Sequence, residues 1–196
     1  MRSIYVVGAG IAGLALLAGC AASEPEVVSY HGDYPVYSSV DDLCGESQLV
    51  ALVTPVSSEV REVDLSAPAG DTPEENPSLG TKNEQAEVPA MIVVETVTTV
   101  RIDTVYKGDA KEGDLIEVGQ PGGLLNGVRY TAERFSLKKG DDALMFLNVW
   151  DNGVPASPLN PTQGTYSVDE AGAVVAAPAN EALKISAFSV EDAICG

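Results

Sequence analysis

Histidine is almost absent from this chain of 196 residues, which contains a single one, His31. A zinc site built on a histidine cluster is therefore excluded, and a Ser-His-Asp or Cys-His group would have to use this residue. We expect His31 to lie in a flexible tether, where no base is held within hydrogen-bonding distance of a nucleophile. P-loop and D-x-D-x-D-G calcium-loop motifs are also missing. The sequence therefore predicts a protein that is not an enzyme and uses no cofactor or metal.

Basic residues are scarce as well, with 11 Lys and Arg against 29 Asp and Glu and a formal net charge of −18. Such a surface repels the phosphates of nucleic acids and anionic lipid headgroups. This argues against a nucleic-acid partner and against membrane attachment through a basic patch. The negative charge either keeps the protein soluble or serves a site for cations or basic partners.

The first twenty residues contain an apolar run with two incompatible interpretations. Gly8, Gly10 and Gly13 match the G-x-G-x-x-G fingerprint of dinucleotide-binding enzymes, such as flavin-dependent oxidoreductases. However, the helix that would follow, Ile11 to Ala22, contains no charged residue, whereas helices that cover one face of such a sheet have a polar side. Alternating strands and long helices are also missing from the rest of the chain. The fingerprint is therefore the weaker interpretation.

The same run fits an export signal better. Arg2 supplies one positive charge, and the uncharged stretch from Ile4 to Leu16 has the length of a signal peptide but is too short to span a membrane. Leu17-Ala18-Gly19-Cys20 then resembles the lipobox of bacterial lipoproteins at all four positions. The resemblance implies that residues 1–19 are removed and that Cys20 is lipidated. It places the protein on the extracytoplasmic face of the cell membrane, with residues 20–37 as the flexible tether.

The remaining two cysteines, Cys44 and Cys195, lie near the two ends of the predicted folded part. Export would place them in a compartment where disulfides persist, and a bridge would close a loop of about 150 residues. Two buried free thiols are the alternative, because the distance between the cysteines cannot be derived from sequence.

The pattern over residues 38–196 predicts a mainly β domain: a small OB-like closed or partly open β-barrel with one or two flanking helices. Short helices are expected at 38–44, with Ser39 as N-cap, and at 181–194. Residues 57–90, rich in acids and proline, are expected to form a long disordered loop. A phase slip at Thr98-Thr99 indicates a bulge or bend. The predicted strands are 48–56, 91–106, 114–120, 127–131, 143–150, 164–168 and 173–175.

Several of these segments carry a family resemblance. TVRIDTVYKGD from Thr99 onward, a following I-x-V strand, and KKGDDALMFL from Lys138 onward look like bacterial relatives of netrin and tissue-inhibitor modules. The resemblance covers about residues 40–196 and implies a five-stranded OB-type barrel that acts as a binding module. In the animal inhibitors a free N-terminal cysteine chelates a protease zinc ion. The lipidated, tethered Cys20 departs from this pattern, so that mechanism is not expected here.

Two groups of residues have open interpretations. Tyr130, Phe135, Phe146 and Trp150 could form a recognition patch, although such residues more often fill the core of a small barrel. The acidic pairs Asp141-Asp142 and Asp169-Glu170 could bind calcium weakly, but acids are common in turns.

These observations predict a membrane-anchored, non-catalytic binding module whose ligand is unknown. The alternative is an inhibitor or modulator of an extracytoplasmic protease or other envelope enzyme, acting through residues 57–90 or 120–127. An enzyme of an unrecognised type would require a cluster of buried carboxylates.

Overall fold

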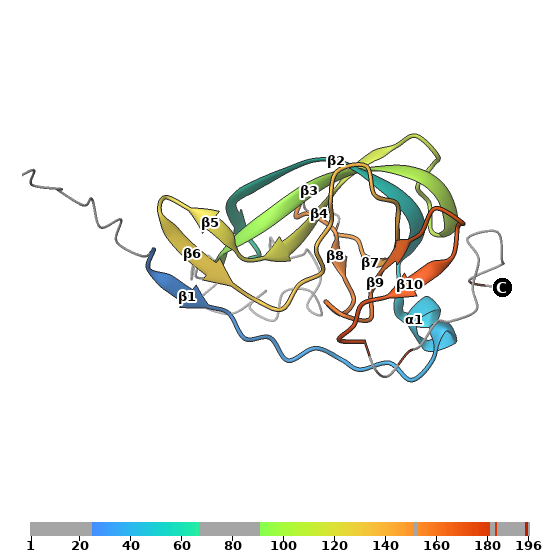
Figure 1. Ribbon diagram of the computed structural model, residues 1–196, viewed down its shortest axis with the longest axis horizontal. Helices are drawn as coiled ribbons and strands as arrows, with labels where there is room; N and C mark the ends of the chain where they lie inside the picture. Colours follow the sequence, from blue (N-terminus) through green and yellow to red (C-terminus); the bar gives the residue numbers. More distant parts are fainter. Residues whose placement is uncertain (1–24, 67–90, 151–152, 181–182, 184–194, 196) are drawn as a thin grey trace, which may run out of the picture.

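Two sixteen-residue strands, β2 (Leu49–Asp64) and β3 (Ile92–Lys107), form the centre of the fold in the computed structural model. The structure describes residues 25–66, 91–150, 153–180, 183 and 195 (Figure 1). Over these residues the protein is mainly β with one helix, as predicted. The predicted second helix, at 181–194, lies almost entirely outside the described residues.

The second half of β2 corrects the prediction of a loop beginning at residue 57. Residues 57–64 continue the strand and pair antiparallel with the first half of β3. Their polar side chains suit this position because most of them are exposed, and cross-strand pairs such as Ser58–Thr98, whose hydroxyls lie 2.8 Å apart, support the ladder. The remainder of the predicted loop, 67–90, lies outside the described residues.

A bulge lies at the middle of this ribbon, on β2 and not on the strand 91–106 where it was predicted. The register of β2 against β3 shifts between Pro55 and Ser57, which pair with Val100 and Thr99. Val56 is therefore an extra residue on β2. A one-residue insertion reverses the faces of all later side chains and bends the strand, so the two halves of β2 serve different surfaces.

The large sheet has the strand order β10-β9-β7-β2-β3-β4, with β8 paired to β7. The bounds of the other members are β4 (Leu115–Pro121), β7 (Ala143–Asn148), β8 (Ser157–Pro158), β9 (Thr165–Val168) and β10 (Val174–Ala176). All of its strand ladders are antiparallel, and the predicted hairpin of residues 164–175 is confirmed as β9–β10.

No sheet in the described part of the chain closes into a barrel, so the closed form of the prediction is wrong. The outer edge of β4 meets a single isolated bridge, in which Val118 lies beside Ala156. The residues near this bridge explain why a longer ladder does not form. Ala156 donates to the carbonyl oxygen of Glu117 and accepts from the N–H of Gly119, and Pro158, two residues further on, has no backbone N–H with which to extend the ladder.

Strand β7 separates two apolar cores because alternate side chains point to opposite faces. Ala143, Met145 and Leu147 pack with residues of β2, β3 and β4. Leu144 and Phe146 point the other way, toward the helix and the β9–β10 hairpin. A strand that is buried on both faces has no reason to alternate with polar residues, which accounts for the apolar run ALMFL.

A second sheet, with the order β1-β6-β5, corrects the predicted tether. Strand β1 (Val27–Ser29) pairs in parallel with β6 (Val128–Thr131), which also pairs with β5 (Gly123–Leu125). The ring of Tyr30 stacks on that of Tyr130, with the centroids 5.8 Å apart. The chain then runs along the molecule to the helix (Figure 1). Residues 25–37 are therefore part of the fold. Backbone hydrogen bonds join Glu26 and Tyr30 to β6, and the side chains of Asn160 and Gln163 bond to the backbone of Pro35 and Tyr37.

Helix α1 (Val40–Glu46) is anchored at both ends. As predicted, Ser39 is its N-cap, and its hydroxyl accepts a hydrogen bond from the backbone N–H of Asp42 at 3.0 Å. Lys107 Nζ donates to the carbonyl oxygens of Cys44 and Gly45 at the other end. Cys44 is bridged to Cys195 in the structure, with the Cα atoms 5.7 Å apart.

Candidate functional site

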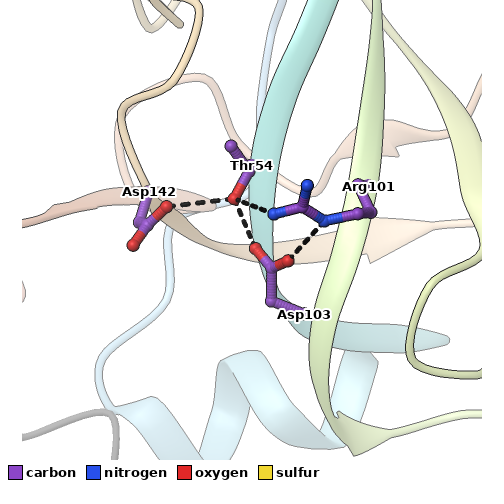
Figure 2. Close-up of polar contacts among 4 residues, drawn as sticks. All are labelled: Thr54, Arg101, Asp103 and Asp142. Atoms are coloured by element: carbon purple, nitrogen blue, oxygen red, sulfur yellow. Dashed lines mark hydrogen bonds and ion pairs between the residues drawn. The ribbon is translucent and has the colours of Figure 1, made fainter.

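A polar cluster on the face of the β2–β3 ribbon joins four residues (Figure 2). Arg101 Nε donates to Asp103 Oδ1 at 2.8 Å, and Arg101 Nη2 donates to Thr54 Oγ1 at 3.2 Å. Thr54 Oγ1 lies within hydrogen-bonding distance of both Asp103 Oδ2 and Asp142 Oδ1. Its single proton is therefore shared between two carboxylates. The cluster is largely exposed and links β2, β3 and the start of β7, so it fits a structural role.

A pocket of 390 Å³ beside β4 is better suited to a ligand. Its floor is formed by Glu95 of β3 and by the residues from Gly119 to Pro121 of β4. Its walls come from the segment around Pro155 and Pro158, and from Tyr34 in the N-terminal segment. Pockets of this volume are typical of sites for small organic molecules.

Glu95 is the most unusual residue of the pocket, because it is an acid with only 6% of its surface exposed. Its cross-strand neighbour on β2 is Arg61. Arg61, however, uses Nη2 to bind Glu117 Oε2 at 2.5 Å, and its Nε lies 3.4 Å from Glu59 Oε1. Among the described residues, no hydrogen bond or ion pair reaches the Glu95 carboxylate. Burial raises its pKa above 4.5, and the positive charge of Arg61 only partly offsets this.

A glycine on the neighbouring strand makes room for this carboxylate. Gly119 pairs with Val97, two residues along β3 from Glu95 and on the same face. A Cβ atom at Gly119 would overlap Glu95 Oε2 and would lie close to the ring of Pro155. The absence of a side chain at this position therefore gives the carboxylate its place in the pocket.

The second charged residue among the described lining residues of the pocket is also an acid. Glu133 also lines it, and no lysine, arginine or histidine is found among its described lining residues. Burial raises the pKa of Tyr34 above 10.0, and the nearby carboxylates of Glu133 and Glu95 add to the effect. Tyr34 consequently stays neutral under physiological conditions, and the negative field of the pocket comes from the two glutamates.

Most of the other lining residues are apolar, including Val154, Pro158, Pro161 and Trp150, and Gln120 and Ser157 are polar. Trp150 is the only tryptophan of the sequence, and 48% of its surface is exposed. The four aromatic residues that the sequence suggested as a recognition patch therefore lie in different environments. Phe146 is fully buried in the core, Tyr130 and Phe135 are partly buried, and Trp150 alone borders the pocket.

The other residues predicted from the sequence do not meet at this pocket. Cys20 lies outside the described residues, and His31 is exposed and does not line the pocket. The carboxylate of Asp169 accepts hydrogen bonds from the backbone N–H groups of Ala171 and Ala173, which accounts for an acid in that turn. No group of three or more potential metal ligands occurs in the described ranges. The helix that the structure describes is too short to cross a membrane.

The segment 120–127, expected to be a loop, includes strand β5. Its turn at Asn126 and Gly127 has positive φ angles of 51° and 82°. Two consecutive positive φ values are those of a tight hairpin turn, and Asn-Gly is the preferred pair for it. The segment is therefore a structured hairpin that ends in this turn.

Sequence reasoning missed Glu95 and Tyr34. A signal for Glu95 was present, because it is the only acid between Met91 and Arg101, in a strand otherwise made of apolar residues and threonine. An acid in a buried strand points to a site. Tyr34 had no such signal, since it lies in the segment expected to be a tether.

Comparisons with protein-family models, with curated proteins and with solved structures find no match for this chain.

Proposed function

We propose that this protein is a lipid-anchored, non-catalytic binding module of the bacterial cell surface, and that it holds a small organic ligand in the pocket beside β4. The observation that carries the proposal is a cavity of 390 Å³ with mostly apolar walls and one buried carboxylate. Apolar walls with a few fixed polar groups are the usual composition of ligand sites. The membrane attachment rests on the lipobox-like sequence that ends at Cys20.

The finer architecture that we propose is a partly open OB-type barrel. The strand order β7-β2-β3-β4 supports it, together with the short segment at Ala156–Pro158, which bonds to β4 on one side and to β7 on the other. In such a barrel the pocket would lie at the incomplete seam. A seam with few backbone bonds leaves room for a ligand between its two edges.

The binding proposal can be tested with Trp150 as an intrinsic reporter, because it is the sole tryptophan and borders the pocket. The lipidated chain, purified in a non-ionic detergent, would be titrated with benzyl alcohol, benzoate and benzyltrimethylammonium while tryptophan emission is recorded. Saturable changes with at least one of the three probes are expected. If none binds at millimolar concentration, as calorimetry would also show, the pocket is not a site for small organic molecules.

The anchor is tested separately by fractionating cells that produce the full chain with Cys20→Ala. The wild-type protein is expected in the membrane fraction and in the detergent phase, and the variant is expected to lose the lipid and to leave the detergent phase. Equal partitioning of both proteins would overturn the lipoprotein proposal without affecting the pocket.

A further inference from the structure

The Glu95 carboxylate is largely buried but has no hydrogen-bond donor among the described residues. With 6% of its surface exposed, it has given up most of its contact with water, yet no donor among the described residues replaces that hydration. Buried charges in proteins are normally paired, because an unpaired charge in an apolar environment is costly. Glu95 is therefore a largely buried acceptor on the pocket lining that forms no hydrogen bond or ion pair with the described residues.

Arg61, the base paired with Glu95 across the strands, makes its ion pairs with other acids. Arg61 stands directly opposite Glu95 on β2, but its guanidinium is drawn toward Glu117 and Glu59. Its positive charge lowers the pKa of Glu95 less than burial raises it. The ion pair that the strand register would permit between Arg61 and Glu95 is thus not formed, and the carboxylate remains available to the pocket.

The groups around Glu95 favour a cation over any other ligand charge. Glu133 adds a second negative charge at the lining, and the hydroxyl of Tyr34 is held neutral by burial and by these acids. Aromatic rings at Tyr34 and Trp150 can receive a cation on their faces. The prolines and Val154 offer apolar surface, which suits a carbon skeleton rather than a hydrated metal ion.

We propose that the pocket binds a small organic cation, an ammonium group carried on an apolar skeleton, with Glu95 as its counterion and Tyr34 and Trp150 beside it. This inference rests on the proposed binding function and names the class of ligand. The ammonium group supplies the charge that Glu95 lacks, and the skeleton covers the prolines around Pro155 and Pro158. The overall charge of −18 also raises the local concentration of cations around the protein.

The three probes introduced above separate this inference from the binding function itself, because they share an aromatic ring but differ in charge. Benzyltrimethylammonium is expected to bind at least about tenfold more tightly than benzyl alcohol, with benzoate the weakest. Equal affinity for the three would overturn the cation proposal and leave the binding function intact. If none of the three probes binds, both the binding function and the cation proposal are overturned.

The decisive variant is Glu95→Gln, which keeps the shape of the side chain and removes its charge. Its affinity for benzyltrimethylammonium is expected to fall by about tenfold or more, while that for benzyl alcohol stays the same. Glu112→Gln is the matched control, because Glu112 is an exposed acid that does not line the pocket. Circular dichroism establishes that both variants are folded. Unchanged cation affinity in folded Glu95→Gln would overturn the assignment of Glu95, and so would a parallel loss of benzyl alcohol binding.

Discussion

The Glu95 carboxylate occupies the space that a side chain at Gly119 would fill. The two residues lie on neighbouring strands, and their relationship couples a backbone position to the chemistry of the pocket. Gly119 has no positive φ angle, so its conformation does not itself require glycine. The requirement comes from the carboxylate and from Pro155.

Gly119→Ala therefore tests the position of the carboxylate without altering its charge. The added methyl group should displace Glu95 from the pocket floor and weaken benzyltrimethylammonium binding by about tenfold, as measured by tryptophan emission. Gly45→Ala is the matched control, since a Cβ at Gly45 would meet no atom within 4 Å. It should leave ligand affinity unchanged. Wild-type affinity in folded Gly119→Ala would show that the carboxylate is free to move aside.

Glu95 should also impose a pH dependence on stability. Its pKa is raised in the folded state, so between 4.5 and that raised value the folded protein binds more protons than the unfolded one. Stability contributed at this site therefore falls as pH rises through that window. Glu95→Gln lacks this term, so the free energy of unfolding of the variant relative to wild type should increase from pH 4 to pH 7. Urea denaturation at a series of pH values measures this. A difference that is constant with pH would contradict the burial of an ionising Glu95.

Ionisation of Glu95 should also control ligand affinity, which should rise with pH whereas the stability contribution of Glu95 falls. Only the ionised carboxylate attracts an ammonium group, so benzyltrimethylammonium affinity should rise with pH through the raised pKa of Glu95 and then level off. The charged groups that face this position are Arg61, Glu117 and Glu133, and Tyr34 stays neutral throughout. Calorimetry of Glu95→Gln over the same range should show a flat profile.

Releasing Arg61 provides a further test. In Glu117→Gln the guanidinium loses its 2.5 Å partner and becomes available to its cross-strand neighbour Glu95. Cation affinity should then fall about two- to fivefold, the magnitude of a partly exposed ion pair. The exposed acid Glu112 again supplies the control, because its neutralisation changes the net charge equally. An equal loss in both variants would mean that only the overall charge matters.

The disulfide should account for a large share of the stability. It joins residues separated by 151 positions, so its removal frees a long loop in the unfolded chain. Simultaneous Cys44→Ala and Cys195→Ala substitutions should lower the free energy of unfolding by about 2–5 kcal/mol in urea. Reductant should destabilise the wild-type protein by a similar amount and leave the double variant unaffected. If reductant has no effect on the wild type, the bridge is absent in solution.

A structural feature could be predicted from the sequence where interactions between residues close in sequence determine it. The N-cap at Ser39 and the β9–β10 hairpin follow from propensities within a few residues, and both were predictable. The second half of β2 was not. Its polar residues resemble a loop, and only the long-range pairing with β3 makes them a strand.

The N-terminal segment and the pocket were missed for the same physical reason. Strand β1 has three residues and no pattern of its own, and it exists because β6 offers a free edge. Glu95 and Gly119 are separated in sequence and come together only through the register of β3 and β4. Sequence alone showed an acidic protein whose charge serves either solubility or a site for cations, but it could not show which acid is buried.

The pairing of β1 with β6 has a mechanical consequence for a chain anchored at Cys20. Only six residues separate Cys20 from Val27, so the attachment reaches at most roughly 25 Å when fully extended. If the chain is anchored as proposed, a pull from the membrane would arrive at β1, where a load along the strand would stretch its hydrogen bonds to β6 together rather than one after another. Tyr30 and Tyr34 follow β1 on the same stretch of chain, and Tyr34 lines the pocket. Tension that the pairing of β1 with β6 does not hold would therefore reach the pocket. The proposed anchor and the proposed ligand pocket would then be connected through the eight residues from Val27 to Tyr34.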